Sequence, residues 1–315
     1  ALPISWYPDD TLDLDLLKKY ADFAMYEVKR SHKGQLGEFN IALYNSALHE
    51  RQLRSEFHQM LRNEAISYHF QPIFSAKDGT PLAYEALMRL SLPTLKSPLD
   101  VLRLARAENK LHDIERITLF KASEAYDALQ RSGKVPAGKL LFINTIASQH
   151  LNEAEENEFV RRFSHLLPQY VSEITEEDEL DMEVLEKKRR FPGGSQVFAL
   201  DDYGSGFNSE KNLLALAPHY IKVDICIVSG IDTDENKQQI VANIVHYAHQ
   251  RDMKIIAEGL ETPAELKTLL RLGVDMLQGY LLAKPAQVPP AISPEALDVI
   301  HSFHCSSGIN GSDPV

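Results

Sequence analysis

Short apolar runs alternate with amphipathic helical stretches along most of the chain. Each run is bounded by polar or turn residues, which is typical of a strand, and the stretches between them repeat apolar residues at helical spacing. The predicted strands cover residues 67–77, 81–90, 139–146, 169–175, 196–202, 219–224, 253–259 and 274–280. Helices are predicted in most of the gaps, among them residues 113–132, 234–252 and 262–272. Strands that alternate with helices favour parallel pairing, and eight such units favour a closed barrel.

The first two predicted strands do not follow this alternation. Only the sequence KDGT, residues 77–80, separates them, and an Asp-Gly connection of that length predicts a hairpin. We therefore expect an α/β fold, a TIM-like (β/α)8 barrel that contains one antiparallel strand.

The two ends of the chain have a different pattern. Residues 11–32 and 49–63 carry apolar residues at helical spacing, and the tail from about residue 303 is rich in Ser and Gly, a composition typical of disorder. We expect a short helical appendage and linker over residues 1–48, the barrel over residues 49–290, and a C-terminal helix with a flexible tail over residues 291–315.

Composition indicates the class of protein but says little about its function. The chain has 315 residues, of which 44% are hydrophobic and 25% charged, as in an ordinary soluble globular protein. It has no apolar run of the roughly 18 residues that cross a bilayer, and its two cysteines, Cys226 and Cys305, suit a reducing compartment. We therefore expect a cytoplasmic protein. Because the first residue is not Met, it could equally be the cytoplasmic part of a longer, membrane-anchored protein. A net charge of −12 disfavours binding to DNA or RNA and direct contact with an anionic membrane.

Polar residues interrupt the apolar pattern where the predicted strands end. They are Glu85, Asn144, Glu173, Asp201, Asp202, Lys222, Asp224, Glu258 and Gln278. Any one of them has a simple structural explanation, since a strand that reaches solvent ends on a polar side chain. In a barrel, however, the carboxyl ends of the parallel strands meet at one mouth, where barrel enzymes carry their chemistry.

Several carboxylates at one mouth need a counter-charge, because like charges disfavour the ionised form. The oxygens of Asp, Glu and Asn suit Mg²⁺ or Mn²⁺ better than zinc, and the neighbours Asp201 and Asp202 can serve two adjacent ions. Two such ions are the usual arrangement for hydrolysing a phosphodiester. Lys222 is a candidate to hold or deprotonate the attacking water, and the alternative is a lysine that only pairs with Asp224.

Three further patterns are weak signals. They are GKVPAGK at residues 133–139, the pairs His246 with His249 and His301 with His304, and the acidic run at residues 176–179. The first lacks the Ser or Thr of a phosphate-binding loop and precedes a predicted strand instead of following one. The histidine pairs lack a third ligand, and an acidic run is typical of a solvated surface.

The segments around the strand ends resemble the EAL family of cyclic di-GMP phosphodiesterases. Glu85-Ala86-Leu87 is the signature triplet, and similar segments follow in the family's order: LFINT, SEITE, LDDYGSGFNS, IKVD, AEGLET and QGYLLAKP, with FQPIF before the triplet. The resemblance spans about residues 50–290, and it is specific because many short motifs recur in order. It implies hydrolysis of cyclic di-GMP to linear pGpG with two divalent ions, Mg²⁺ or Mn²⁺, in a barrel that forms a homodimer.

The resemblance also implies a role for each matching residue. The metal ligands would be Glu85, Asn144, Glu173, Asp201, Asp202, Asp224 and Glu258. Lys222, Glu85, Glu258 and Gln278 would take part in catalysis, Gln71, Leu87 and Arg89 would contact the dinucleotide, and Glu261 would steady the loop after the Asp pair. In the segment SEITE, Glu173 is preferred to Glu176 because it lies on the predicted strand.

Two places depart from the family's pattern. The loop at residues 203–211 is unusual at Asn208 and at the following Glu210-Lys211, which leaves open whether dimerisation regulates activity. Ile225-Cys226 replaces a common Arg-Ser. Upstream, YPDD followed by LLKKYADFAMYEVKRSHKG resembles the end of a GGDEF domain without its catalytic motif, and the alternative is an unrelated amphipathic helix.

The leading hypothesis is a phosphodiesterase specific for cyclic di-GMP. A second hypothesis is a catalytically inactive receptor that binds cyclic di-GMP and regulates a partner, and a third is a barrel hydrolase for another phosphate ester. Inactive members of the family typically lose metal ligands, and no matching ligand is lost here. The matches at Gln71 and Arg89 weigh against another ester.

Overall fold

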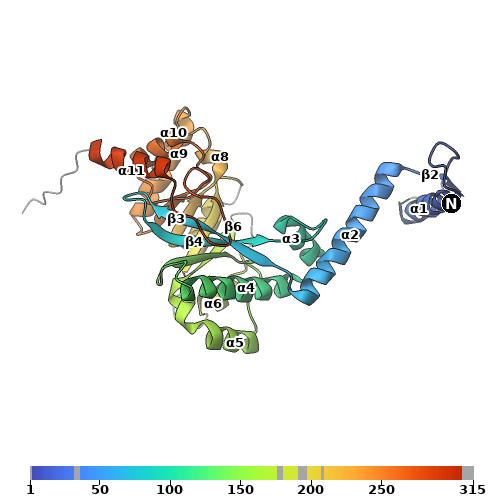
Figure 1. Cartoon of the computed structure of the whole chain (residues 1–315), viewed down its shortest axis with the longest axis horizontal. Coiled ribbons are helices and arrows are strands. Elements are labelled where there is room, and N and C mark those ends of the chain that lie inside the picture. The colour runs from blue at the N-terminus through green and yellow to red at the C-terminus, as the bar shows by residue number, and fades with distance from the viewer. Residues whose placement is uncertain (1, 32–35, 176–179, 191–196, 207–208, 307–315) are drawn as a thin grey trace, which may run out of the picture. The chain divides into compact units, whose positions relative to one another are not determined.

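The computed structural model describes residues 2–31, 36–175, 180–190, 197–206 and 209–306. The chain folds as two compact units, one of residues 1–65 with 91–104 and the other of residues 66–90 with 105–315. The second unit contains a closed barrel with the strand order β10-β3-β4-β5-β6-β7-β8-β9 (Figure 1). Its strands are β3 (Ser67–Ser75), β4 (Pro81–Arg89), β5 (Leu140–Asn144), β6 (Tyr170–Thr175), β7 (Val197–Tyr203), β8 (Tyr220–Val223), β9 (Lys254–Ala257) and β10 (Met276–Leu277).

The pairing of the strands confirms the expected fold. β3 is antiparallel to both of its neighbours, β4 and β10, and every other pair in the barrel is parallel. The hairpin between β3 and β4 is formed by the Asp-Gly turn, in which Thr80 N donates to Asp78 Oδ1 over 3.0 Å and Gly79 has a φ of +71°. That positive φ suits glycine, because it has no Cβ.

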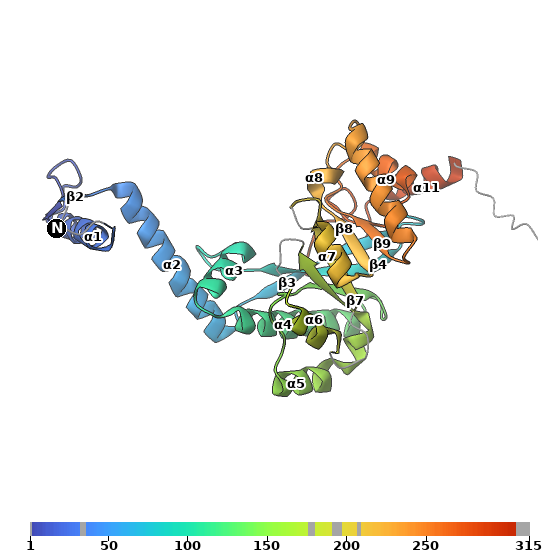
Figure 2. The same cartoon turned by 180° about the vertical axis from the view of Figure 1, so that it is seen from behind.

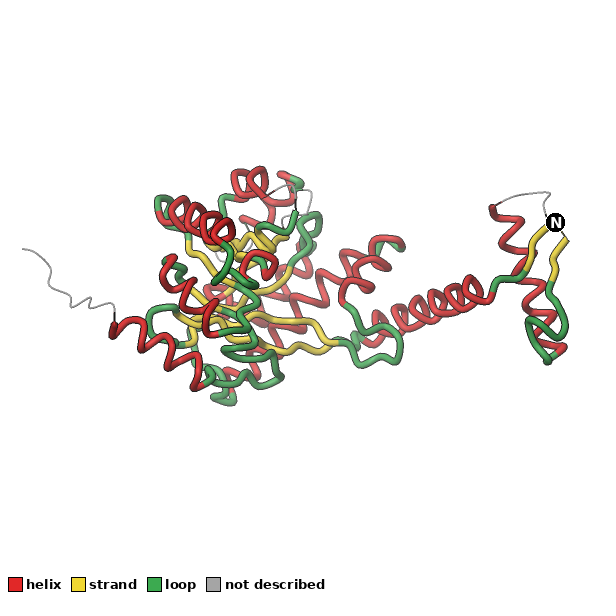
Figure 3. The backbone as a smooth tube through the Cα atoms, turned by 90° about the horizontal axis from the view of Figure 1, so that it is seen from above, coloured by secondary structure: helices red, strands yellow, loops and turns green. Residues whose placement is uncertain are grey.

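Helices surround the barrel strands (Figure 3), and α7, α8 and α9 are seen beside β7, β8 and β9 in Figure 2. The outer elements are α4 (Leu111–Arg131), α5 (Glu153–Phe163), a 3-10 helix (Ser164–Gln169), α6 (Met182–Arg189), α7 (Ser209–Leu216), α8 (Ile225–Val228), α9 (Glu235–His249), α10 (Pro263–Leu272) and α11 (Pro294–Ser306). The prediction of a loose tail from residue 303 is wrong for residues 303–306, because α11 continues through them and Phe303 packs against the core. The described part of the chain has no helix with the length and apolar character needed to span a membrane.

The barrel interior is filled by one layer of apolar side chains. Seven strands contribute to it, and Tyr220 of the eighth packs against it; the seven residues are Ile73, Ala83, Phe142, Val171, Ala199, Ile256 and Met276. A second, larger apolar cluster lies between the strands and the outer helices. The interior layer closes the barrel below the mouth, so the mouth ends in a packed floor and not in a channel.

The first unit confirms the helix predicted over residues 11–32 and contains two short strands that the sequence did not predict. β1 (Leu2–Ile4) pairs in parallel with β2 (Leu36–Glu38), α1 (Leu14–Ser31) lies between them in the chain, and Tyr20 stacks on Phe39 with ring centroids 3.9 Å apart. Strands of three residues are too short to give a clear alternation. The helix predicted from residue 49 begins earlier, since α2 (Ile41–Asn63) is capped by Asn40 and runs through residues 48 and 49 without a break.

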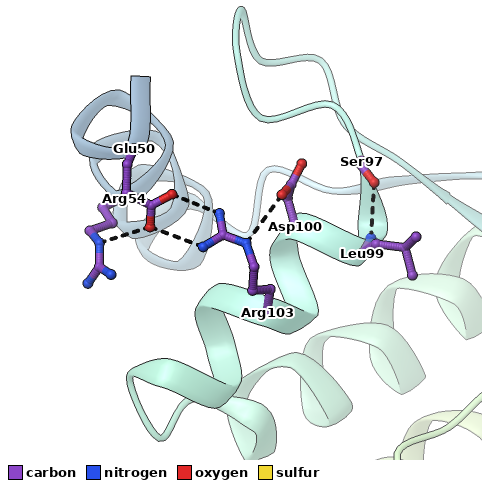
Figure 4. A network of polar contacts seen from close by, with 6 residues as sticks. All are labelled: Glu50, Arg54, Ser97, Leu99, Asp100 and Arg103. Atoms are coloured by element: carbon purple, nitrogen blue, oxygen red, sulfur yellow. Dashed lines mark hydrogen bonds and ion pairs between the residues drawn. The ribbon is translucent and has the colours of Figure 1, made fainter. Parts of the chain in front are cut away.

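Two carboxylates of α2 hold the segment that includes the start of α3 (Pro98–Ala107). Glu50 accepts two parallel hydrogen bonds from Arg103, at 3.1 and 3.0 Å, and Arg54 and Asp100 complete the network (Figure 4). The buried Glu56 accepts hydrogen bonds from the backbone amides of residues 94 and 95. The exposed network around Glu50 contributes little stability. The buried Glu56 carboxylate, in contrast, fixes the backbone at residues 94 and 95.

Candidate metal centre

The alternation of the strands places a polar residue above each member of the interior layer. Residues two positions apart on a strand face the same way, and the residue two positions after each interior apolar side chain is polar. These residues are Glu85, Asn144, Glu173, Asp201, Lys222, Glu258 and Gln278. On the antiparallel β3 the direction is reversed, and the corresponding residue, Gln71, comes two positions before Ile73. These eight of the predicted site residues therefore form the layer directly above the floor.

Both members of the Asp pair reach the mouth because the strand is irregular there. The pairing of β7 with β8 shifts between Leu200 and Tyr203, and Asp202 has a left-handed φ of +57°. In a regular strand two successive side chains point to opposite faces. The irregularity lets Asp201 and Asp202 line the same cavity.

The mouth encloses a cavity of about 360 Å³. Its lining includes the predicted residues Gln71, Glu85, Asp201, Asp202, Lys222, Asp224, Glu258, Glu261 and Gln278. Within the part of the chain that is described, carboxylate oxygens form two compact triplets, Glu85 with Glu173 and Asp201, and Asp201 with Asp202 and Glu258. In each triplet the oxygens lie within 4.8 Å of one another, and Asp201 belongs to both.

Lys222 lies among these carboxylates and is buried, with 1% of its surface exposed. Its Nζ is 2.5 Å from Glu173 Oε1, 2.7 Å from Glu258 Oε1, 2.9 Å from Asp201 Oδ1 and 3.6 Å from Glu85 Oε2. Burial alone would lower the pKa of Lys222, but the surrounding carboxylates, Asp201 first among them, raise it well above its ordinary value. One ammonium thus faces four carboxylates, which leaves the cluster with too little positive charge.

The pKa values of the carboxylates reflect this shortage of positive charge in the cluster. Burial raises the pKa of Glu173, the Glu85 carboxylate raises it further, and Lys222 offsets only part of the rise, so the pKa is well above its ordinary value. Burial likewise raises the pKa of Glu258 well above its ordinary value. Burial and the neighbouring Asp201 raise the pKa of Asp202 to about 6. These acids lack a counter-charge in the fully ionised state.

The donor set fits hard divalent cations. All ligand atoms in the two triplets are oxygens, and Glu173 Oε2 and Gln278 Oε1 are buried without a hydrogen bond from any described residue. Buried acceptors that lack a donor are unfavourable. Divalent cations bound by oxygen ligands would supply both the missing partners and the missing charge.

Two amides fix Glu85 at the centre of the mouth. Gln278 Nε2 donates to Glu85 Oε2 over 2.6 Å, and Asn144 Nδ2 donates to Glu85 Oε1 over 3.3 Å. Asn144 is exposed and is not part of the cavity lining. The structure therefore brings all three residues together, with the amides oriented toward the carboxylate.

Asp224 and Glu261 line the cavity but lie outside the triplets. Asp224 caps α8, since its Oδ1 accepts from Cys226 N over 2.8 Å, which leaves Oδ2 for another partner. The loop that carries Glu261 is held by Glu265, whose carboxylate accepts from the amides of Glu261, Thr262 and Gly230. Sequence reasoning missed Glu265, although Thr262 and Glu265 form the Thr-x-x-Glu pattern of a capping box.

Of the three predicted dinucleotide contacts, only Gln71 lines the cavity, and its Nε2 donates to the carbonyl of Ala283 over 3.1 Å. Leu87 and Arg89 lie two and four positions beyond Glu85 on β4, on the same face of the strand, and the cavity lining does not include them. The lining also contains Ile225 and Tyr280, which sequence reasoning did not place in the site.

The patterns judged weak have structural explanations where they are described. Residues 133–139 lie in the loop before β5. His249 Nε2 lies 2.9 Å from Asp275 Oδ2, and His304 Nε2 lies 3.0 Å from the carbonyl of Ala76. The acidic run at residues 176–179 lies outside the described residues.

Comparison with known proteins shows the family. The sequence model of the family described as EAL domain matches residues 54–285. The chain belongs to the EAL domain family. A cyclic di-GMP phosphodiesterase of Pseudomonas aeruginosa, NbdA, is 28% identical over 296 residues, which cover 90% of this EAL chain and 37% of NbdA. The cyclic di-GMP phosphodiesterase PdeR of Escherichia coli strain K12 is 26% identical over 292 residues, 90% of this chain and 43% of PdeR. The chain thus spans less than half the length of either relative.

A solved structure supports the same assignment. The PaMucR phosphodiesterase in complex with c-di-GMP is 26% identical and has a TM-score of 0.64, and the match covers 75% of this EAL chain and 97% of that chain. A standalone EAL protein from Vibrio cholerae, also bound to c-di-GMP, shares the fold at 24% identity with a TM-score of 0.60.

Proposed function

We propose that this EAL protein hydrolyses cyclic di-GMP to linear pGpG with two divalent cations, Mg²⁺ or Mn²⁺. The observation that carries the proposal is the place of Asp201 in two overlapping carboxylate triplets, because its two oxygens could serve two adjacent cations, the arrangement suited to phosphodiester hydrolysis. The substrate is inferred from the relatives, which include cyclic di-GMP phosphodiesterases.

Each carboxylate triplet would hold one of the two cations. Glu85, Glu173 and Asp201 would hold one cation, and Asp201, Asp202 and Glu258 the other, with Asn144 and Asp224 beside them. When bound, the cations would lower the pKa of a water molecule and offset negative charge on the phosphodiester.

Lys222 would hold or deprotonate the attacking water. In the metal-free site the surrounding carboxylates raise its pKa and favour the ammonium form, which donates hydrogen bonds, whereas bound cations would offset those carboxylates and lower this pKa. In the reaction the water oxygen forms a new bond to phosphorus, the bond from phosphorus to the 3′ oxygen breaks, and that oxygen takes up a proton. One opened linkage converts the cyclic dinucleotide to pGpG.

Gln278 and the predicted dinucleotide contacts would orient the reacting groups. Gln278 holds Glu85 through its amide group, and this fixes a metal ligand in place. Gln71 lies in the cavity lining, and Leu87 and Arg89 continue the same face of β4 toward solvent. The Arg89 guanidinium would bind a phosphate, for which its paired donors are suited.

The remaining assignments concern the rest of the chain. The barrel over residues 49–290 would be the phosphodiesterase, acting in the cytoplasm as a homodimer, and residues 291–315 a C-terminal helix and tail. Residues 1–48 would be the end of a GGDEF-like domain and a linker, and α2 crosses the end of that segment without a break.

The test is incubation of the full chain with cyclic di-GMP and Mg²⁺ or Mn²⁺, followed by chromatography. We expect pGpG from the wild type and no detectable product from Glu85→Gln or Lys222→Met. Glu295→Gln is the matched control, because Glu295 is an exposed carboxylate on α11 and lies outside the cavity lining. Binding of cyclic di-GMP without turnover in either metal would contradict hydrolysis and identify a receptor. The absence of binding would contradict the substrate.

A further inference from the structure

The one-turn helix α8 lies between two loops that adjoin proposed cation ligands. The loop after β7 follows the Asp pair, and the loop after β9 begins with Glu258. A Cβ on Gly204, in the first loop, would collide with the side chain of Ile227. A Cβ on Gly259, in the second, would collide with the side chain of Ile225. Both loops therefore pack directly on α8, so a displacement of this helix would reach the carboxylates on either side.

The end of α8 is held by a carboxylate from another element. Glu265 of α10 is buried, with 5% of its surface exposed, and its Oε1 accepts from the amide of Gly230 over 2.9 Å, two residues after α8 ends. Its Oε2 accepts from the amides of Glu261 and Thr262, over 3.1 and 2.9 Å. One carboxylate thus joins the segment after α8 to the loop that begins with Glu258.

A helix cap explains only one of these two connections. Thr262 and Glu265 form the capping box of α10, in which the side chain of Glu265 needs one oxygen for the amide of Thr262. A glutamine would serve the same purpose with its single acceptor oxygen. The other oxygen of Glu265 reaches Gly230, which is 35 residues away in the chain and outside the cap. Only a carboxylate can accept at both oxygens, so the residue type suits a link between the two segments.

Glu265 has its partners within the protein. Burial raises the pKa of Glu265, but the hydrogen bonds from the amides of Gly230, Glu261 and Thr262 lower it below the ordinary value of 4.5. The carboxylate is therefore ionised at neutral pH and needs no cation. This is what is expected of a group that orients metal ligands without binding the metal itself.

We infer that Glu265 is a positioning residue of the metal centre, which locks α8 between the two loops and so fixes Glu258 relative to the Asp pair. The inference rests on the proposed function, because it requires that the triplet of Asp201, Asp202 and Glu258 binds a cation. Without the bond to Gly230, α8 can shift against the loop after β9, and the triplet loses its compact geometry. Groups that orient metal ligands typically contribute about 10- to 100-fold to metal affinity.

The experiment measures Mn²⁺ binding to the full chain by calorimetry in the absence of substrate. Glu265→Gln should raise one of the two Mn²⁺ dissociation constants by about 10-fold. Its single acceptor oxygen should stay with the amides of Glu261 and Thr262, so hydrogen exchange at the amide of Gly230 should become faster. Because the capping box is retained, the variant should unfold near the urea midpoint of the wild type. In the hydrolysis assay the activation constant for Mn²⁺ should rise by the same factor, with an unchanged KM at saturating Mn²⁺.

The matched control is Thr262→Ala. It removes the hydroxyl that accepts from the amide of Glu265 over 3.2 Å at the start of α10, and it keeps every backbone amide that donates to the carboxylate. Loss of this cap should lower the urea midpoint. Both Mn²⁺ dissociation constants, and exchange at the amide of Gly230, should stay at their wild-type values.

The other outcomes overturn the inference. Unchanged Mn²⁺ binding in Glu265→Gln would refute the positioning role, and an equal weakening in Thr262→Ala would assign the effect to the end of α10 and refute it as well. If the wild type binds Mn²⁺ without hydrolysing cyclic di-GMP, the proposed function fails, while the Mn²⁺ titrations still decide the role of Glu265. Absence of Mn²⁺ binding by the wild type would overturn the metal centre and this inference together.

Discussion

At the mouth of the barrel Glu173 is enclosed with three other acids around one lysine, while at the opposite end Asp275 is surrounded by donors. Asp275 accepts hydrogen bonds from His249 Nε2, Lys254 Nζ and the backbone amide of Ile255, at 2.9, 2.8 and 2.9 Å. Burial raises the pKa of Asp275, but these donors lower it below the ordinary value of 3.8. Burial and the Glu85 carboxylate raise the pKa of Glu173 well above its ordinary value, and Lys222 offsets only part of this rise.

The difference teaches that burial alone does not decide what a carboxylate does. Where the fold supplies donors, as at Asp275 or in the buried pair of Glu115 with Lys188 at 2.6 Å, the acid stabilises the protein. Where the fold places carboxylates together in excess of positive charge, the acids need bound cations to compensate their charge, which is typical of a functional site. Four predictions test this contrast.

The largest effect is expected at the shared ligand. Asp201→Asn should lower the turnover of cyclic di-GMP by at least about 1000-fold, because it weakens both proposed cation sites at once. Chelation of the wild type with EDTA should cause a comparable loss that Mn²⁺ reverses. Asp298→Asn, at an exposed residue of α11, is the control, and near-normal turnover in Asp201→Asn would refute the shared role.

The opposite end of the barrel should respond in stability and not in activity. Asp275→Asn should lower the free energy of unfolding at neutral pH by about 2 kcal/mol, because it weakens three hydrogen bonds to a partly buried carboxylate. Urea unfolding measures the loss, and kcat should stay at the wild-type value. An unchanged unfolding midpoint would mean that the donors around Asp275 compensate its negative charge as poorly as Lys222 compensates the carboxylates at the mouth.

A smaller change of opposite sign is expected at Glu173. Glu173→Gln should raise the stability of the metal-free protein by about 1 kcal/mol, because it removes one uncompensated charge from the cluster. It should also reduce the increase in Tm that Mn²⁺ causes in the wild type. Thermal unfolding in EDTA and in Mn²⁺ measures both effects, and a destabilised metal-free variant would contradict the proposed excess of negative charge.

The smallest effect is a pH dependence at Asp275. Because the pKa of Asp275 is lowered in the folded state, its stabilising contribution is present above the ordinary value of 3.8 and is lost as the pH falls through the folded-state pKa. The difference in unfolding free energy between the wild type and Asp275→Asn should therefore be constant near neutral pH and shrink in acid. A difference in unfolding free energy that grew as the pH fell would contradict the lowered pKa of Asp275.

Much of the fold could be predicted because the strand signals were strong. The alternating runs and the Asp-Gly turn at Asp78 and Gly79 were sufficient for the barrel and its antiparallel strand. The start of α2 was missed because the run IALYN was not joined to the helical pattern after residue 49, although Asn40 is a suitable cap. Tyr280 and Ile225 were missed as parts of the site because an apolar residue after a strand carries no signal of its own.

The sequence by itself determined which polar residues form the layer above the floor. A polar residue stands two positions beyond each interior apolar one, and the period of a strand converts this spacing into a layer. Only the tertiary structure decided how the members of that layer pair. The position of Asp201 in both triplets and the four carboxylates around Lys222 depend on the register between strands far apart in the chain, such as Thr175 opposite Asp201. That register is set by closure of the whole barrel and the packing of its floor, which no local pattern encodes.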